Sequence, residues 1–446
     1  MLTLLTVQEA QASILRRDNT LSLHDVEMTE AQKAAATQIY GSPLTPEQGV
    51  RHILSDVQQH GDAALKDWTA KLDKVELDRF EIPKTEFAAG LARIDSTLRQ
   101  ALETAAQRIR AFHEMQPLPN WTTSELGGTL GQRVTPIRRV GVYVPGGTAP
   151  LPSTLLMCAI PARVAGVKEL IVTTPPDKNG GVPDVILAVA ALAEIDQLYT
   201  VGGAQAIGAL TFGTETIRRV DKIVGPGNLW VTLAKRQVYG FVGVDGLYGP
   251  TETAVVADSS ANPAWIAADM LAQAEHDVLA TAILFTPSQP LAEAIQVELG
   301  KQLELRARAE IIEQSLTRQG GIVITRDMDE ACQLASDFAA EHTCIASDTP
   351  AQYLEKIPDA GGLFVGEHSF EVLGDYVAGP SHVMPTEATA RFASPLNVSD
   401  FVKINSIIQL DSATAAALSP LAATIAQAEG LDGHAAAALQ RVKDEA

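Results

Sequence analysis

Two patterns of apolar positions divide the chain. Before about residue 125, apolar residues recur every three or four positions, as at 46–57 and 97–109, and this spacing predicts amphipathic helices. From Gly131 onward, short apolar runs alternate with Ala-rich stretches and with Gly and Pro. The runs predict buried strands at 140–144, 169–174, 197–201, 253–258, 281–286, 321–325 and 362–366, with helices at 154–166 and 182–194. This is the rhythm of βαβ units, so we expect parallel sheets with helices on both faces.

The pattern therefore predicts an α/β protein with two Rossmann-like parallel-sheet domains and smaller helical N- and C-terminal segments. A chain of 446 residues is too long for one ordinary core, which agrees with several domains. We expect the tail to be helical rather than strand-like. The expected parts are an N-terminal helical segment at 1–30, a discontinuous first α/β domain at 31–130 and 248–385, a second α/β domain at 131–247, and a C-terminal tail at 386–446.

Composition narrows the classes of partner and compartment. The formal net charge is −20, which argues against a nucleic-acid backbone or an anionic membrane as partner. The three cysteines form no C-x-x-C pair, so a disulfide framework is not expected and a cytoplasmic location is. The start lacks the basic region of a secretory signal. Although 140–162 is uncharged, its prolines and glycines break it, so we expect no membrane span.

Four of the nine histidines lie beside oxygen-bearing side chains in separate short clusters. These are Gln273-Ala-Glu-His276, Glu341-His342, the segment from Asp375 to His382, and the segment from Glu429 to His434. Imidazole and oxygen donors without a thiolate suit Zn²⁺ or another borderline divalent ion. Glu341-His342 also offers adjacent groups for proton transfer. Taken singly, each cluster has an ordinary alternative, such as a capped helix end, a surface dipeptide or a turn.

Glycine-rich loops follow three apparent strands, which end near residues 144, 201 and 224. The segment Val140-Gly-Val-Tyr-Val-Pro-Gly-Gly runs from a strand into a loop before a helix, where α/β folds often bind phosphate. The alternative is a tight connection with no ligand. The loops after Val201 and Val224 add Gln205 and Asn228 as hydrogen-bonding groups. The dinucleotide fingerprint G-x-G-x-x-G is absent, so any dinucleotide must bind in another way.

Taken together, these segments resemble the histidinol dehydrogenase family. The similarity runs from about Arg138 to the C-terminus and continues more weakly through the N-terminal helices. The segments that carry it are Gly-Val-Tyr-Val-Pro-Gly-Gly, Gly-Gly-Ala-Gln-Ala-Ile, Asp-Lys-Ile-Val-Gly-Pro-Gly-Asn, Gly-Pro-Thr-Glu-Thr, Gln-Ala-Glu-His, Glu-His, Gly-Asp-Tyr-Val-Ala-Gly-Pro-Ser-His and Glu-Gly-Leu-Asp-Gly-His.

The resemblance implies a reaction and a set of residues. The family oxidises L-histidinol to L-histidine in two NAD⁺-dependent steps through an enzyme-held aldehyde. It implies a zinc ion bound by Gln273, His276, Asp375 and His434, which orients the substrate. It implies His342 as the base that takes the hydroxyl proton and Glu341 as the group that activates water. Substrate contacts are implied for these six residues and for Thr251, His382 and Glu429, and cofactor contacts for Tyr143, Gln205 and Asn228.

The resemblance also implies a homodimer in which the C-terminal tail carries Glu429 and His434 into the partner's site. This chain departs from the family pattern at several positions. Thr251 replaces a serine, Ser381 replaces an asparagine, the loop at 277–281 differs, and Glu387-Ala388 replaces a Gly-Gly pair. None of these changes removes a proposed ligand or catalytic group, but the last puts the local backbone conformation in doubt.

Three other functions compete with this interpretation. A related enzyme could oxidise a sulfonated diol, but the carboxylate of Glu429 suits a cationic amino alcohol better. A zinc hydrolase would need an open metal position but no nicotinamide pocket. A metal-binding scaffold without catalysis would leave Glu341-His342 unexplained.

Overall fold

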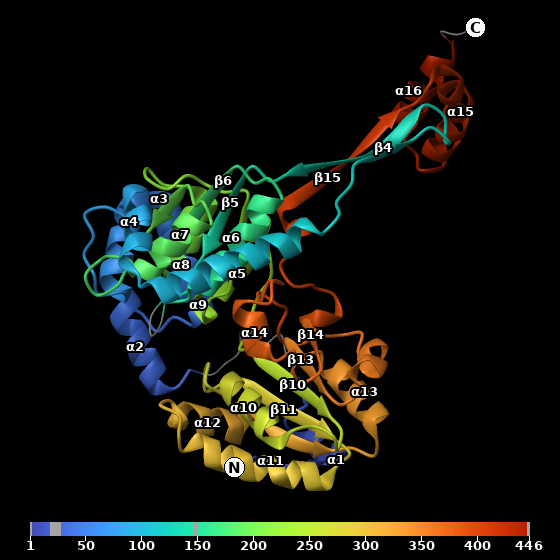
Figure 1. Cartoon of the computed structure of the whole chain (residues 1–446). Coiled ribbons are helices and arrows are strands. Elements are labelled where there is room, and N and C mark those ends of the chain that lie inside the picture. Colours follow the sequence, from blue (N-terminus) through green and yellow to red (C-terminus); the bar gives the residue numbers. More distant parts are fainter. Residues whose placement is uncertain (1, 18–27, 147–149, 444–446) are drawn as a thin grey trace. The chain divides into compact units, whose positions relative to one another are not determined.

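Two six-stranded sheets with the same internal strand order organise the larger part of the chain. The structure is a computed structural model that describes residues 2–17, 28–146 and 150–443. The β5 sheet has the order β2-β7-β6-β5-β8-β9, and the β10 sheet has the order β1-β12-β11-β10-β13-β14. Except for antiparallel β2, all pairings in both sheets are parallel. The α/β class with parallel sheets is therefore confirmed (Figure 1).

The strand bounds agree closely with the apolar runs of the sequence. The β5 sheet contains β2 (Glu81–Ile82), β5 (Arg139–Tyr143), β6 (Glu169–Thr173), β7 (Gln197–Tyr199), β8 (Lys222–Val224) and β9 (Gly243–Val244). The β10 sheet contains β1 (Leu4–Thr6), β10 (Glu252–Ala257), β11 (Thr281–Thr286), β12 (Gly321–Ile324), β13 (His342–Ala346) and β14 (Gly362–Val365).

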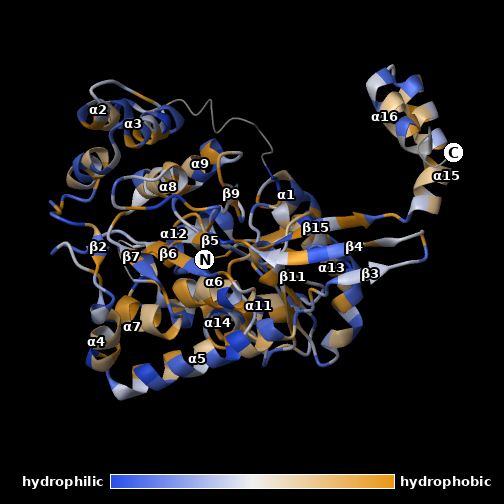
Figure 2. Ribbon diagram, turned by 90° about the horizontal axis from the view of Figure 1, so that it is seen from above, coloured by the Kyte–Doolittle hydropathy of each residue, from blue (hydrophilic) through white to orange (hydrophobic). Residues whose placement is uncertain are grey.

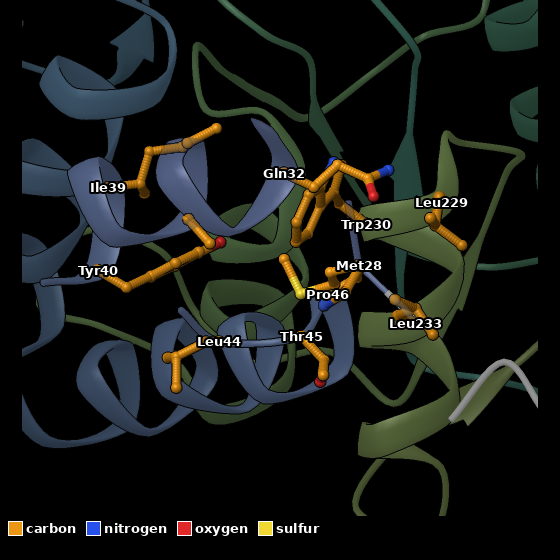
Figure 3. A pocket seen from close by; sticks show the side chains of 12 residues that line it. Met28, Gln32, Ile39, Tyr40, Leu44, Thr45, Pro46, Leu229, Trp230 and Leu233 are labelled. Carbon is orange, nitrogen blue, oxygen red and sulfur yellow. The ribbon is translucent and has the colours of Figure 1, made fainter. Parts of the chain in front are cut away.

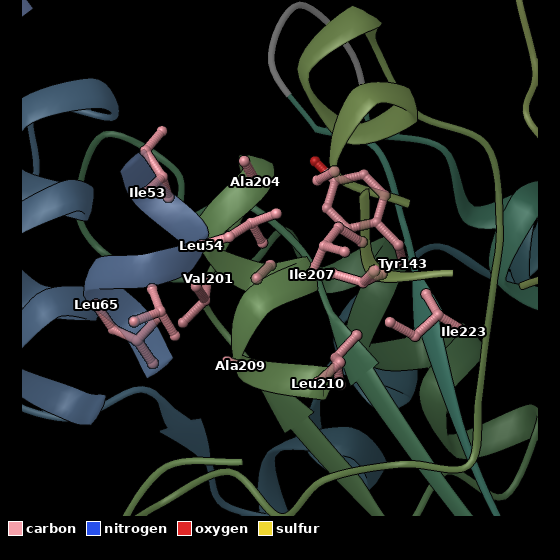
Figure 4. Close-up of a cluster of buried hydrophobic side chains, with 14 of the residues drawn as sticks. Ile53, Leu54, Leu65, Tyr143, Val201, Ala204, Ile207, Ala209, Leu210 and Ile223 are labelled. Atoms are coloured by element: carbon pink, nitrogen blue, oxygen red, sulfur yellow. The ribbon is translucent and has the colours of Figure 1, made fainter. Parts of the chain in front are cut away.

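Helices cover both faces of the β5 sheet. One face packs against α3 (Pro46–Leu72), α8 (Gly203–Phe212) and α9 (Leu229–Val238), with α2 (Glu30–Tyr40) beside α3. The remaining helices of this part are α4 (Thr85–Arg93), α5 (Ser96–Glu114), α6 (Pro152–Val164) and α7 (Asp184–Leu192). Figure 4 shows the buried cluster in which Ile53 and Leu65 of α3 meet Ile207 of α8 and Ile223 of β8.

The helices between residues 46 and 114 thus pack on the β5 sheet, not on the β10 sheet. This packing does not match the expected grouping of 31–130 with 248–385, since α3, α4 and α5 contact helices of the β5 sheet. The helical pattern shows which face of α3 is buried, but it carries no information about which sheet covers that face. The N-terminal segment also differs, because it contributes strand β1, which pairs with β12.

Alternating side chains of the β10 sheet pack against different helices. Val255 and Leu284 face the cluster of α10 (Pro263–Ala274), α11 (Gln289–Leu303) and α12 (Ala309–Gln319). Ala254 and Ile283 face α13 (Met328–Phe338) and α1 (Val7–Ala12) on the other side. This is the period-two alternation of a strand that is buried on both faces. The helix α14 (Glu371–Tyr376) follows β14.

Residues 116–137 and 401–446 form a second, smaller unit. Its antiparallel sheet has the order β15-β4-β3, made of β3 (Trp121–Thr123), β4 (Thr129–Pro136) and β15 (Val402–Gln409), followed by α15 (Ser412–Ala428) and α16 (Asp432–Lys443). The prediction of a tail that is not strand-like was wrong for β15. The residues of β15 are mostly exposed, and its sequence has no continuous apolar run like those of the buried strands (Figure 2).

Among the described residues, no helix is both long and apolar enough to cross a membrane.

Candidate active site

The predicted catalytic residues lie where strands of the β10 sheet begin. Glu341 directly precedes β13 and Thr251 directly precedes β10, and these two strands are neighbours in the sheet. His276 lies in the connection between α10 and β11. The β10 sheet thus places Thr251 and Glu341 at the amino ends of its strands, whereas the glycine-rich loops of the β5 sheet follow carboxyl ends. The strand β13 itself was missed, because Glu341-His342 had been considered only as a dipeptide.

These residues line a pocket of about 200 Å³. Its wall includes Thr251, His276, Glu341, His342, Asp375 and His382, which come from four separate stretches of sequence. Ser153 and Thr154 in the first turn of α6, and Pro226 in the loop after β8, also line it. The structure thus brings six of the predicted site residues together, although their roles stay predictions.

A chain of hydrogen bonds joins Gln273, Thr251 and Glu341. Gln273 Nε2 donates to Thr251 Oγ1 over 2.6 Å, and the Thr251 hydroxyl donates to Glu341 Oε2 over 2.5 Å. The backbone amide of Glu252 donates to the same carboxylate oxygen over 3.3 Å. Burial raises the pKa of Glu341 to about 7, against the opposing effect of His342 and these donors. The Thr251 hydroxyl, which a serine at this position would also supply, thus links Gln273 to Glu341.

His342 is buried and held through one ring nitrogen. With the ring protonated at Nδ1, that nitrogen donates to the backbone carbonyl of Glu252 over 3.2 Å. Nε2 lies 3.6 Å from Asp375 Oδ1 and has no hydrogen-bond partner among the described residues. Burial lowers the pKa of His342, but the negative charges of Glu371, Glu341 and Asp375 outweigh it and raise the pKa to about 10. Nε2 is therefore the ring nitrogen available for proton exchange, and it is surrounded by carboxylates.

Asp375 and His382 come from α14 and the turn after it. The ring of His382 donates from Nδ1 to the backbone carbonyl of Asp375 over 2.7 Å, which fixes the turn. Burial alone would raise the pKa of Asp375, but the positive charge of His342, with smaller contributions from His382 and His276, holds the pKa below its usual value. An ionised carboxylate beside imidazoles is a suitable partner for a cation.

Only some of the predicted metal ligands lie close together. In the described parts of the chain, no group of three or more His, Cys, Asp and Glu side chains is placed to hold a metal ion. His276 and Asp375 share the pocket, and Gln273 is one hydrogen bond from its wall. Glu429 and His434 belong to the smaller unit, where both are exposed around the junction of α15 and α16. The donors present fit a borderline divalent cation, but they are fewer than a complete zinc site needs.

The predicted cofactor residues lie at the carboxyl edge of the β5 sheet. Tyr143 ends β5, and its hydroxyl accepts a hydrogen bond from the Gly203 amide over 3.2 Å; burial raises its pKa to about 12 (Figure 4). Gln205 is buried in the first turn of α8. Asn228 caps α9 by accepting from the amides of Trp230 and Val231. In a sheet with this strand order, the loops after β5 and β8 diverge, which is where such folds bind ligands.

Two residues that the sequence analysis did not identify hold the loop before Asn228. The Lys235 ammonium donates to the carbonyl of Gly225 over 3.0 Å and pairs with Asp245 over 2.5 Å. Asp245 in turn accepts from the amide of Gly225 over 2.7 Å. Gly225 has φ of 109°, a conformation that favours glycine. A lone lysine and a lone aspartate ten residues apart gave no signal in the sequence.

A separate hollow of about 300 Å³ lies between α2, the start of α3 and α9 (Figure 3). Ile39, Tyr40, Leu44, Trp230 and Leu233 contribute to its largely apolar wall. Its lining contains no carboxylate, imidazole or thiol, so we assign no chemistry to it.

The comparison with protein families decides the classification. The family model described as histidinol dehydrogenase matches residues 43–442. The chain belongs to the histidinol dehydrogenase family. As a member of this family it is an oxidoreductase.

Individual members of the family match this chain over most of its length. A histidinol dehydrogenase of Thermus thermophilus is 50% identical over 391 residues, which cover 88% of this chain and 93% of the relative. One from Deinococcus radiodurans is 47% identical over 437 residues, 98% of each chain. The crystal structure of histidinol dehydrogenase from Elizabethkingia anophelis superimposes with a TM-score of 0.89 at 32% identity, covering 99% of this chain and 98% of that one.

Proposed function

We propose that the protein oxidises L-histidinol to L-histidine through L-histidinal, with two NAD⁺ as hydride acceptors and a zinc ion in each site. The observation that carries this proposal is the shared pocket in which Thr251, Glu341, His342 and Asp375 meet. The reaction forms the last steps of histidine biosynthesis, and we place it in the cytoplasm.

The geometry around Glu341 and His342 supports two different roles in proton transfer. The carbonyl of Glu252 holds His342 through Nδ1, so Nε2 is the nitrogen left for proton transfer. Because the surrounding carboxylates raise the pKa of His342 to about 10, Nε2 serves as the base for the substrate hydroxyl only when a bound cation offsets that negative charge. Glu341 is buried, with a pKa of about 7, which suits a base that takes a proton from water near neutral pH. Water activated in this way attacks the aldehyde and gives the hydrate that is oxidised in the second step.

We propose that Gln273, His276, Asp375 and His434 hold the zinc ion, and that Thr251, His382 and Glu429 contact the substrate with them. When bound, the zinc ion supplies a positive centre that orients the substrate's imidazole and amino nitrogens and offsets the negative charge around His342. His276 and Asp375 line the same pocket, which supports their assignment as ligands.

The NAD⁺ site is proposed at the carboxyl edge of the β5 sheet, with Tyr143, Gln205 and Asn228 as contacts. Pro226, in the loop before Asn228, also lines the catalytic pocket, so a cofactor on this edge would reach the reacting atoms. The buried Gln205 Oε1 has no hydrogen-bond partner within the described part of the chain, and a bound cofactor would supply one.

We propose a homodimer in which each site receives His434 and Glu429 from the partner chain. Among its described residues, the smaller unit that carries them has a buried apolar cluster of three alanines. It exposes large apolar side chains, with Ile408 73%, Leu421 61% and Ile425 63% accessible. Exposed apolar residues of this size are typical of a surface that a partner covers.

The test is the formation of NADH when purified zinc-loaded protein meets L-histidinol and NAD⁺. We expect two NADH for each L-histidine formed, and a rate lower by about 10² to 10⁴ from a His342→Asn control. A protein that oxidises a sulfonated diol but not L-histidinol, or that hydrolyses a substrate without NAD⁺, would contradict the proposal.

A further inference from the structure

Glu252 contacts both catalytic residues through its backbone. Its amide donates to Glu341 Oε2 over 3.3 Å, and its carbonyl accepts from His342 Nδ1 over 3.2 Å. The orientation of this one residue therefore affects the direction of the Glu341 carboxylate and the tautomer of His342. Its side chain is only 4% exposed and carries a carboxylate that needs a partner inside the protein.

That partner is Arg17, from the N-terminal segment that follows α1. Its guanidinium forms a two-pronged ion pair with Glu252, in which Nη2 lies 3.0 Å from Oε2. The same Nη2 donates to the carbonyl of Phe338 over 2.8 Å, and the guanidinium carbon lies 3.7 Å from the centre of the Phe338 ring. Phe338 ends α13, three residues before Glu341.

Arg17 thus joins the two segments that carry the catalytic pair. One is the start of β10, through the Glu252 side chain, and the other is the end of α13, which leads into Glu341 and β13. The backbone amide of Glu387 adds a third donor to Glu252 Oε2 over 3.2 Å. A planar guanidinium can bind a carboxylate with two donors, stack on a ring and still reach a carbonyl, which a lysine cannot do.

We propose that Arg17 and Glu252 are positioning residues for the oxidation, acting on Glu341 and His342 through the Glu252 backbone. This inference rests on the proposed roles of Glu341 and His342. It gives the N-terminal segment a part in catalysis through the Arg17–Glu252 ion pair. These two residues are 235 positions apart in the sequence.

The first test compares Arg17→Met, which keeps an unbranched apolar stem but removes the guanidinium, with Arg17→Lys and with Arg99→Met. Arg99 is a matched control, since it forms only a half-exposed pair with Glu103. A small displacement of catalytic groups costs up to about 100-fold in rate, so we expect Arg17→Met to lower kcat by about 10- to 100-fold. KM for L-histidinol is expected to change by less than about threefold, because substrate contacts remain. Arg17→Lys should recover part of kcat.

A double-mutant cycle separates positioning from a general loss of stability. Glu252→Gln removes the buried charge, and the Arg17→Met/Glu252→Gln pair leaves no unpaired ion even if Arg17→Met alone folds poorly. If Arg17 acts through Glu252, the pair has a kcat no lower than that of the worse single variant. Multiplied effects in the pair, or a wild-type kcat in Arg17→Met, would overturn the inference.

A second measurement does not depend on turnover. Amide hydrogen exchange of the peptide covering Glu341–Ala346 is expected to quicken in Arg17→Met, while exchange in β11 stays as in wild type. Unchanged exchange at Glu341–Ala346 would overturn the positioning role. If the wild-type protein does not oxidise L-histidinol, but exchange at Glu341–Ala346 is still faster in Arg17→Met than in wild type, the proposed function is refuted and the positioning contact is not.

Discussion

Replacing Glu341 by glutamine is expected to stabilise the protein at alkaline pH while harming its activity. The pKa of Glu341 is raised from 4.5 to about 7, chiefly by burial, so the folded state binds its proton more tightly than the unfolded chain does. Between these pH values the folded state holds more protons, and the contribution of Glu341 to stability falls as the pH rises. Above pH 7 the carboxylate is charged in both states and its full penalty remains, about 3 kcal/mol for a shift of this size.

Glutamine removes the charge but keeps an oxygen that can accept from Thr251 and the Glu252 amide. In chelator-treated protein, Glu341→Gln is therefore expected to raise the free energy of unfolding by about 1 kcal/mol at pH 5.5 and about 3 kcal/mol at pH 8. Urea unfolding followed by tryptophan fluorescence at both pH values measures the difference. Glu103→Gln, at an exposed ion pair, is the control and should show no such trend. A Glu341→Gln effect that is the same at both pH values, or a loss of stability at pH 8, would refute the reasoning.

Four further outcomes are expected. His342→Asn should lower turnover of L-histidinol by about 10² to 10⁴ in steady-state assays, while Glu341→Gln should mainly slow the oxidation of added L-histidinal; near-normal turnover of L-histidinol by His342→Asn would contradict the base assignment. Chelation should abolish NADH formation yet leave the circular dichroism spectrum intact, and Zn²⁺ should restore activity; full activity in demonstrably metal-free protein would exclude the orienting role. Mixing inactive His276→Ala and His434→Ala proteins should restore about one quarter of wild-type activity, because half of the dimers are mixed and each has one intact site; a fully active monomer would rule this out. Ala388→Gly should raise the free energy of unfolding by about 0.5 kcal/mol, and with it the urea midpoint, because relief of the left-handed conformation (φ 63°) outweighs loss of one methyl. A lower midpoint would show that the methyl contact dominates.

The parts of the fold that are coded locally were predictable. Runs such as 281–286 and 169–174 are strands because consecutive apolar, β-branched residues suit a strand buried on both faces. The exposed strand β15 was not predicted, since its stability depends on pairing with β4 and not on an apolar run. The doubt raised by Glu387-Ala388 was justified, because both residues adopt positive φ where the family pattern has two glycines.

The candidate site was predictable only through its motifs. Spacing and residue type pointed to His276, Glu341, His342 and Asp375, and the structure gathers them in one pocket. That they would meet at amino ends of strands did not follow from the sequence, because periodicity shows a strand's extent but not which of its ends meets the other sheet. Arg17 gave no signal either, since its partner is distant in the chain.

The two sheets place their site residues at opposite edges, and this arrangement determines which loops can vary in sequence without altering the site. In the β10 sheet, the loops after β10 and β13 lie at the carboxyl edge, and none of their described residues lines the catalytic pocket. They are closed by their own hydrogen bonds, since Asp258 accepts from the hydroxyls of Ser260 and Ser347. Insertions or altered sequences at this edge would leave the reacting groups in place. The same change one strand length away, before Glu252 or His342, would alter the site itself, so variation among enzymes built this way should accumulate at the carboxyl edge of the β10 sheet.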